Sequence, residues 1–187
     1  MRKSKRKELL EATWSVIAER GVHGLRVEDV AAAVGVANSL VYYHFGNRAG
    51  LLAATMDYND ELAASPKRAT GTGYARIERV LLADLGDAKS SRANNIVWNE
   101  LNAAAVFDDE LRGRVADVDR KWVAQVADSI RIGLQDGSIR PDVNPEEAAA
   151  ILTALLGGLV TRYLAGSTTR AECRHMVKKA IAAHLAP

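Results

Sequence analysis

The sequence predicts an all-α protein with about nine helices. Apolar residues make up 48% of the 187 residues, and along most of the chain they recur at the three- and four-residue spacing of one helix face. The chain has four prolines, and we find no segment with the alternating apolar pattern of a strand. Turn residues divide the pattern into a small N-terminal group of three helices, over residues 1–47, and a larger helical part over residues 48–187. Within the larger part we expect a linker over residues 65–73 and a polar loop over residues 87–93, which leads into a helix over residues 94–106.

Residues 27–51 contain two short predicted helices that meet at a tight turn. The first has an apolar side made by Val27, Val30, Ala31 and Val34. Gly35 follows it and can adopt the left-handed conformation that ends a helix. The second helix runs from about Ala37 to Phe45 and packs inward through Val36, Val41 and Phe45. A small residue at the crossing and a glycine in the turn are typical of a helix-turn-helix, whose second helix lies in the DNA major groove.

The residues after this motif resemble one family. An aromatic-rich helix that runs into a basic residue is matched by Tyr42, Tyr43, His44, Phe45, Asn47, Arg48 and Leu51. On these residues the chain is similar to the TetR family of transcriptional regulators over about residues 8–56. The stretch from Trp98 through the loop at 137–142 to Gly157 and Gly158 also resembles the BetI-like subgroup. The resemblance implies a DNA-binding domain over residues 1–47 and an effector-binding and dimerisation domain over residues 48–187.

The candidate DNA-binding residues lie on and beside the second helix of the motif. They are Arg26, Asn38, Ser39, Tyr42, Tyr43, His44 and Arg48. An asparagine favours adenine through paired hydrogen bonds, and a basic residue at a helix start favours phosphate. Arginine has no side-chain acceptor, so Arg26 cannot cap the helix that follows it. Residues 1–50 carry eight Lys/Arg and five Asp/Glu.

A basic arm precedes the first predicted helix. It consists of Arg2, Lys3, Lys5, Arg6 and Lys7. Such a run is either a solvated tail or a contact to the DNA backbone, and beside a helix-turn-helix we favour the contact. The expected DNA partner is a double-stranded, two-fold-symmetric operator.

The helix expected over residues 145–165 is apolar on most of its sides. Such a helix must be covered on more than one side. Burial within the monomer is one reading, but the resemblance implies a homodimer in which the last two helices of each subunit form a four-helix bundle. Gly157 and Gly158 would allow close approach. The candidate interface residues are Leu152, Leu155, Leu156, Leu159, Val177 and Ile181.

A small-molecule effector site is expected where tryptophans and amides share helix faces. The candidates are Trp98, Asn102, Trp122 and Gln125. Pockets of this kind are mostly apolar with a few directed polar groups, although core packing with surface amides would give the same pattern. The near-neutral composition of the remaining chain favours an uncharged or weakly charged organic ligand with an aromatic or alkyl portion. A cation held against tryptophan faces is the alternative.

Other functional classes find little support in the sequence. There is no phosphate-binding glycine loop and no nucleophile–base pair, so we expect no enzyme and no cofactor. Cys173 is the single cysteine, and it would lie about 200° around a helix from His175, so we expect no metal site. We expect a cytoplasmic protein without a membrane span, because the longest uncharged apolar stretch, residues 148–161, is too short and no signal peptide is visible. The sequence therefore predicts a ligand-responsive transcriptional repressor, with a DNA-coating architectural protein as the alternative.

Overall fold

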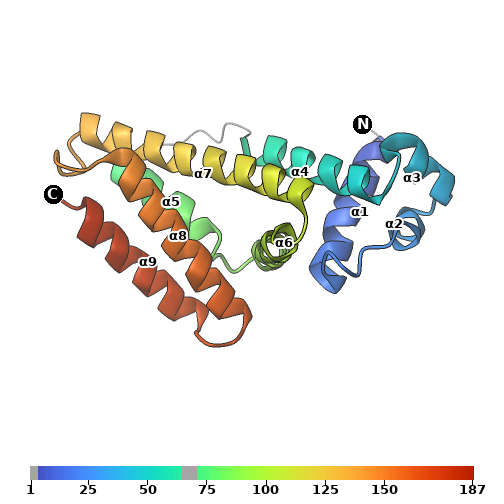
Figure 1. The fold of residues 1–187 in the computed structure, drawn as a ribbon. Helices are drawn as coiled ribbons and strands as arrows, with labels where there is room; N and C mark the ends of the chain where they lie inside the picture. Colours follow the sequence, from blue (N-terminus) through green and yellow to red (C-terminus); the bar gives the residue numbers. More distant parts are fainter. Residues whose placement is uncertain (1–3, 65–70) are drawn as a thin grey trace. The chain divides into compact units, whose positions relative to one another are not determined.

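The computed structural model describes residues 4–64 and 71–187, and the side chains of these residues outside 61–64. Over this part the chain forms nine α-helices and no strand, as predicted (Figure 1). The helices are α1 (Lys5–Arg20), α2 (Val27–Val34), α3 (Asn38–Phe45), α4 (Arg48–Ala64), α5 (Gly73–Ala83), α6 (Lys89–Ala105), α7 (Asp109–Gln135), α8 (Pro145–Leu164) and α9 (Arg170–Leu185).

Two helices begin earlier than the sequence suggests. The Ser4 hydroxyl accepts a hydrogen bond from the Lys7 amide (3.3 Å) and caps α1. Residues 5–7 of the predicted basic arm therefore belong to α1, whereas residues 2 and 3 lie outside the described part. Helix α6 begins at Lys89, so the loop expected over residues 87–93 was wrong for its last five residues. The predicted linker at 65–73 also falls mostly outside the described residues, and α5 begins at its last residue, Gly73.

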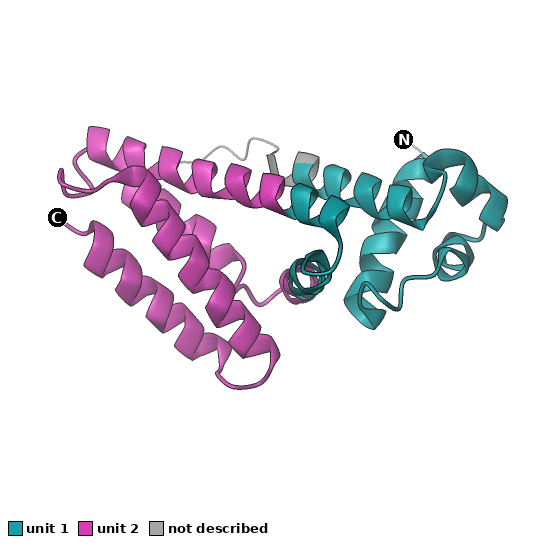
Figure 2. Ribbon diagram, viewed as in Figure 1, with its two compact units in different colours: residues 1–66, 96–115 teal, residues 67–95, 116–187 magenta. Residues whose placement is uncertain are grey.

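The chain divides into two compact units, which we call unit 1 (residues 1–66 and 96–115) and unit 2 (residues 67–95 and 116–187) (Figure 2). Both α6 and α7 contribute to each unit. These units are defined by packing and do not coincide with the functional boundary expected after residue 47, which stays a prediction. In unit 1, α1 packs against α2 and α4, and α3 packs against α2 and α4.

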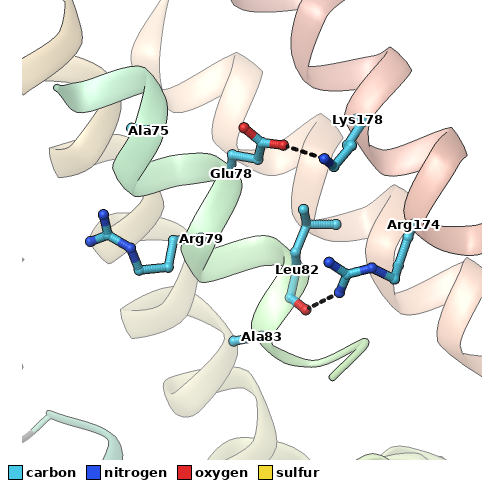
Figure 3. A pocket seen from close by; sticks show the side chains of 7 residues that line it. All are labelled: Ala75, Glu78, Arg79, Leu82, Ala83, Arg174 and Lys178. Atoms are coloured by element: carbon cyan, nitrogen blue, oxygen red, sulfur yellow. Dashed lines mark hydrogen bonds and ion pairs between the residues drawn. The ribbon is translucent and has the colours of Figure 1, made fainter. Parts of the chain in front are cut away.

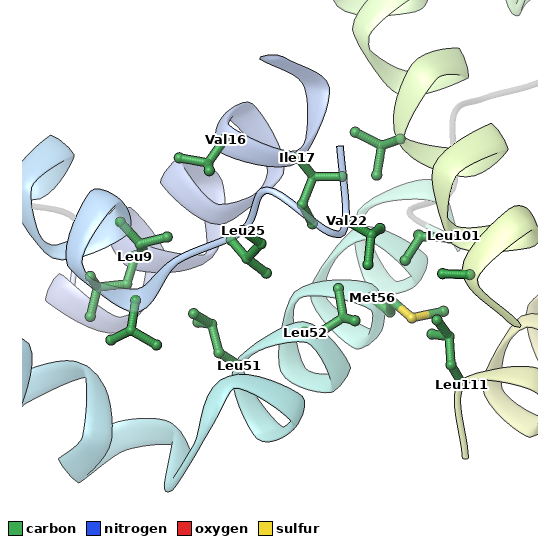
Figure 4. Packing of buried hydrophobic residues seen from close by; sticks show 14 of the residues in the cluster. Leu9, Val16, Ile17, Val22, Leu25, Leu51, Leu52, Met56, Leu101 and Leu111 are labelled. Carbon is green, nitrogen blue, oxygen red and sulfur yellow. The ribbon is translucent and has the colours of Figure 1, made fainter. Parts of the chain in front are cut away.

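The core of unit 1 joins the N-terminal helices to the C-terminal half of α6. Leu9, Ile17, Leu51 and Leu101 are completely buried within it. Figure 4 shows Met56 of α4 beside Leu101 of α6 and Leu111 of α7, and Met56 is 1% exposed. Burying side chains of this size contributes about 1.5 to 3 kcal/mol each. The three-helix head is thus packed as one body with part of α6.

Unit 2 is built from α5, α8, α9 and most of α7. Its α5 and α7 come so close that a Cβ on Gly73 would lie 2.1 Å from the backbone nitrogen of Gly133, so a larger side chain has no room there. The carboxylate of Asp136 accepts a hydrogen bond from the Gly73 amide (2.8 Å) at the same place. At the start of α8, the Asn144 side chain accepts hydrogen bonds from the amides of Glu146 and Glu147, the two residues after Pro145.

Most of the predicted dimer-interface residues lie in the core of unit 2. Five of the six candidates are at most 5% exposed within their own chain, namely Leu152, Leu156, Leu159, Val177 and Ile181. Leu155 is half-buried against the same core. A side chain enclosed in this way has no surface left for a second subunit. The apolar periodicity identified a buried face, and the chain itself covers that face.

Helix α8 is, among the described residues, the one helix long and apolar enough to cross a membrane by length and composition. Core helices of soluble proteins pass the same test. In α8 the side chains on one face are buried in unit 2, as the exposed fractions above show. The packing of that face accounts for its apolar composition.

Candidate nucleic-acid interface

The helix-turn-helix has the geometry that its sequence predicts. Helix α2 ends at Gly35, which adopts the left-handed conformation (φ 68°, ψ 44°). The amide of Val36 then donates to the carbonyl of Ala31 (3.0 Å), which closes the turn. Ala31 and Val41 are each 1% exposed, and they anchor the two helices against one another. The turn therefore sets the direction of α3 through contacts that span only ten residues.

The opposite side of α3 presents polar and aromatic side chains to solvent. Tyr43 is 82% exposed and Tyr42 is 46% exposed. Asn38 and Ser39 are exposed in the first turn of the helix. The N-cap residue, Ala37, makes no side-chain capping bond, so no capping side chain competes with an anionic partner for the first amides of α3. This surface offers donors, acceptors and aromatic edges on one short helix.

The end of α3 is held by aromatic contacts. His44 is half-buried and meets the ring of Tyr43 edge-on, with centroids 5.2 Å apart and planes at 69°. Phe45 is half-buried against the core of unit 1. The guanidinium of Arg6 lies 5.5 Å from the centre of the Phe45 ring, within the range of a cation–π interaction. One residue of the predicted basic arm thus helps to hold α3, a role that its sequence position does not indicate.

Arg48 has a structural role that the sequence did not reveal. Its Nε donates to the carbonyl of Leu25 (2.9 Å), and its Nη2 donates to the carbonyl of Val22. Part of its hydrogen-bonding capacity is therefore used inside the head before any phosphate is bound. Arg26 precedes α2 and makes no side-chain capping bond, as predicted, and its side chain is exposed.

The predicted effector residues divide between the two units. Trp98 is half-buried in unit 1, where its ring meets Trp14 edge-on with centroids 5.8 Å apart. Asn102 is exposed, and its amide donates to the carbonyl of Trp98 (2.8 Å). In unit 2, Trp122 is half-buried against the core and Gln125 is exposed. The contact with Trp14 means that at least one of the tryptophans also serves core packing.

Unit 2 has an open groove of about 450 Å³ between α5 and α9, which contains none of these four residues. Three of its charged groups, Glu78, Lys178 and Arg174, are bound within the chain (Figure 3). Lys178 pairs with Glu78 (2.9 Å), and Arg174 donates to the carbonyls of Leu82 and Leu85 (3.1 Å each). The guanidinium thus satisfies carbonyls at the end of α5, so we read the groove as a helix contact rather than a ligand site.

The pKa of one buried carboxyl and the search for a metal-binding cluster bear on the chemistry of the described residues. Burial raises the pKa of the Asp84 carboxyl, at the end of α5, to about 6. The described residues contain no group of three His, Cys, Asp or Glu that could hold a metal ion. Ionisable groups in environments that disfavour their charge occur frequently at functional sites.

Comparisons with known proteins agree with this arrangement. Residues 9–55 match the family described as bacterial regulatory proteins, tetR family, and residues 73–186 match the BetI-type transcriptional repressor C-terminal domain. The chain is 28% identical over 167 residues to the transcriptional regulator BetI of Burkholderia mallei, covering 87% of this chain and 83% of that protein.

Solved structures extend the similarity to nearly the whole chain. A putative TetR-family regulator from Rhodococcus sp. has a TM-score of 0.88 at 35% identity, covering 97% of this chain and 98% of that one. A putative regulator from Saccharomonospora viridis, solved in complex with choline, has a TM-score of 0.87 at 26% identity and covers 97% of each chain.

Proposed function

Because this chain belongs to the TetR family of transcriptional regulators and has a BetI-type C-terminal domain, we propose that it is a repressor that a small organic effector releases from a two-fold-symmetric operator. The observation that carries the proposal is the surface of α3. A helix anchored by Val41, 1% exposed, presents Tyr43, 82% exposed, to solvent. Exposed aromatic and amide side chains on an anchored helix are suited to reading base edges in the major groove.

Base reading is assigned to the first turns of α3. Asn38 and Ser39 are exposed there and offer hydrogen bonds to base edges, with adenine the preferred partner of an asparagine. Tyr42 and Tyr43 offer ring edges to thymine methyl groups and hydroxyls to phosphate. Arg26 is exposed at the start of α2, and we assign it a contact with the DNA backbone. The half-buried His44 would contribute less than these residues.

A homodimer would supply two recognition helices to one operator. Its interface is assigned to the outward side of α8 and α9, in place of the residues that the structure buries. Ile151 is 41% exposed and Met176 is 38% exposed on these helices. A Cβ on Gly157 or Gly158 would meet nothing within 4 Å of its own chain, so a partner helix could approach closely there.

The effector is proposed to be an organic molecule with an aromatic or alkyl portion, bound by the residues predicted from the sequence, either Trp98 and Asn102 in unit 1 or Trp122 and Gln125 in unit 2. A cation is the second candidate, since the Saccharomonospora viridis structure contains choline. An effector that prefers the conformation unable to bind DNA would release the operator. The regulator would act in the cytoplasm, where its DNA is.

Operator selection from random DNA, followed by footprinting, tests the proposal. The expected result is a two-fold-symmetric site whose half-sites are about 34 to 36 Å apart, or a multiple of this spacing. Tyr43→Ala should reduce the preference for this site over random DNA, whereas the exposed control Asp119→Asn on α7 should not. Binding that is almost indifferent to sequence would support the architectural alternative and contradict the proposed repressor.

A further inference from the structure

The turn between α1 and α2 is held from two sides by helices distant in sequence. The amide of Val22 donates to Oε2 of Glu100 on α6 (3.0 Å), across 78 positions of the chain. The carbonyls of Val22 and Leu25 accept from the guanidinium of Arg48, at the start of α4. Both backbone polar groups of Val22 are therefore bound by charged side chains. Hydrogen bonds to charged groups are stronger than those between neutral groups.

Gly21 makes this arrangement possible. Its φ is +73°, a conformation that disfavours other residues. A Cβ at Gly21 would lie 2.5 Å from Oε2 of Glu100, so the carboxylate occupies space that only glycine leaves open. Apolar packing also stabilises this turn. Val22 is 4% exposed and Leu101 is completely buried, and both belong to the cluster shown in Figure 4. The turn and α6 are thus joined by both polar and apolar contacts.

The two charged side chains connect three elements of unit 1. Glu100 lies on the part of α6 that belongs to unit 1, and Arg48 directly follows the turn that ends the recognition helix. Helix α6 is uninterrupted from Lys89, and its residues 89–95 belong to unit 2. There the buried Asn95 donates to the carbonyl of Asp84 (2.8 Å). Asn95 and Glu100 are five residues apart, a rise of about 7.5 Å along one helix.

We propose that Glu100 is a positioning residue that couples α6 to the helix-turn-helix, through the amide of Val22 and onward through Arg48. A shift of α6 would move the α1–α2 turn, because the carboxylate holds its backbone, and would thereby change the setting of α3. The proposal rests on the proposed function, in which the effector-binding part controls DNA binding. Coupling of this kind is reciprocal, so operator binding must also alter α6.

Amide hydrogen exchange on the full chain tests this coupling, with and without the selected operator. Glu100→Ala removes the acceptor, whereas Glu100→Gln keeps an oxygen that can accept the same hydrogen bond. In the free protein, Glu100→Ala should accelerate exchange of residues 21–25 about ten- to hundredfold. The wild type and Glu100→Gln should show operator-induced protection in residues 89–95, and Glu100→Ala should lose it. A merely structural role would lower stability without removing this protection from the operator-bound protein.

Substitution of glycine supplies a matched control. Gly21→Ala should behave like Glu100→Ala, because the added methyl displaces the carboxylate. Gly166→Ala places alanine at an equally positive φ, +75°, where a Cβ would meet nothing within 4 Å. It tests the effect of alanine at a positive φ away from the contact with Glu100, and it should leave the protection of residues 89–95 unchanged. Combining Gly21→Ala with Glu100→Ala should add no further loss of protection, since both act on one contact.

The outcomes separate this coupling from the proposed repressor function. If Glu100→Ala keeps the operator-induced protection of residues 89–95, the coupling is refuted while the repressor proposal stands. If selection yields no preferred DNA, the repressor proposal fails. Hydrogen exchange in the free protein then still tests the coupling through Glu100. Faster exchange in both residues 21–25 and 48–52 of Glu100→Ala would then support transmission through Arg48, and faster exchange confined to residues 21–25 would overturn it.

Discussion

Replacing Asp84 by asparagine should stabilise the protein at neutral pH. The aspartate ends α5, and burial raises the pKa of its carboxyl from 3.8 to about 6. The folded environment therefore disfavours the ionised form. The amide of Asn95 donates to the backbone carbonyl of Asp84 (2.8 Å), a bond that the substitution leaves in place. Asparagine has nearly the same size and carries no charge, so the change isolates the cost of the buried carboxylate.

The magnitude follows from the two pKa values. One pKa unit corresponds to about 1.36 kcal/mol, so a rise from 3.8 to about 6 costs about 3 kcal/mol once the group is ionised in both states. The folded protein holds the proton more tightly than the unfolded chain does. This contribution to wild-type stability is therefore full below pH 3.8, declines as the pH rises, and is lost above about pH 6. Asp84→Asn should exceed the wild type by up to about 3 kcal/mol at pH 7.5 and match it near pH 3.5.

Urea unfolding followed by circular dichroism between pH 3.5 and 8 measures this difference. Protein concentration and ionic strength must be equal in all samples, because any dimer has a stability that depends on concentration. Comparing variants at each pH removes the contributions of the other carboxylates. The exposed control Asp119→Asn, on α7, should follow the wild type. Parallel pH profiles for Asp84→Asn and the wild type would refute the reasoning.

Five further substitutions test the remaining assignments. Asn38→Ala should cost about 1 to 3 kcal/mol on the selected operator and little on random DNA, and equal losses in fluorescence anisotropy would make Asn38 a backbone contact. Arg48→Ala should lower the free energy of unfolding by about 1 to 3 kcal/mol, because two loop carbonyls lose their donor, and unchanged stability in urea would contradict that role. Ile151→Glu should abolish dimerisation in sedimentation velocity with the fold retained, whereas Leu152→Ala should cost about 2 to 5 kcal/mol of stability; a wild-type monomer at micromolar concentration would contradict the dimer. Asn102→Ala should weaken release of the operator by ligands that dissociate the wild-type complex, at unchanged operator affinity, and undiminished release would place the effector elsewhere.

Local features were predictable because each depends on residues within one or two helical turns. Gly35 adopts the left-handed conformation that its place after an apolar helix suggests. Val41 is buried, as its spacing from that turn requires. Pro145 begins α8 next to the Asn144 cap. The start of α6 was missed, because serines at 90 and 91 are compatible with a loop as well as a helix.

The candidate dimer-interface residues show what the apolar periodicity of a sequence cannot determine. It identifies which residues of α8 are apolar but not what covers them. Leu152 and Leu156 proved to belong to the chain's own core, whereas Ile151 and Gly158 are exposed. On a helix that is apolar on most sides, adjacent positions belong to different faces, so the choice between core and interface depends on the position of the other helices.

The sequence by itself determined the all-helical class, the helix-turn-helix and the family resemblance, since these follow from helical spacing, turn chemistry and a contiguous motif. Only the tertiary structure decided that Arg48 binds the carbonyls of the α1–α2 turn and that Glu100 accepts the amide of Val22. These contacts join residues 23 to 78 positions apart. Each one links a side chain to a backbone group, and because every non-proline residue carries the same backbone donor and acceptor, no residue type in the sequence marks the partner.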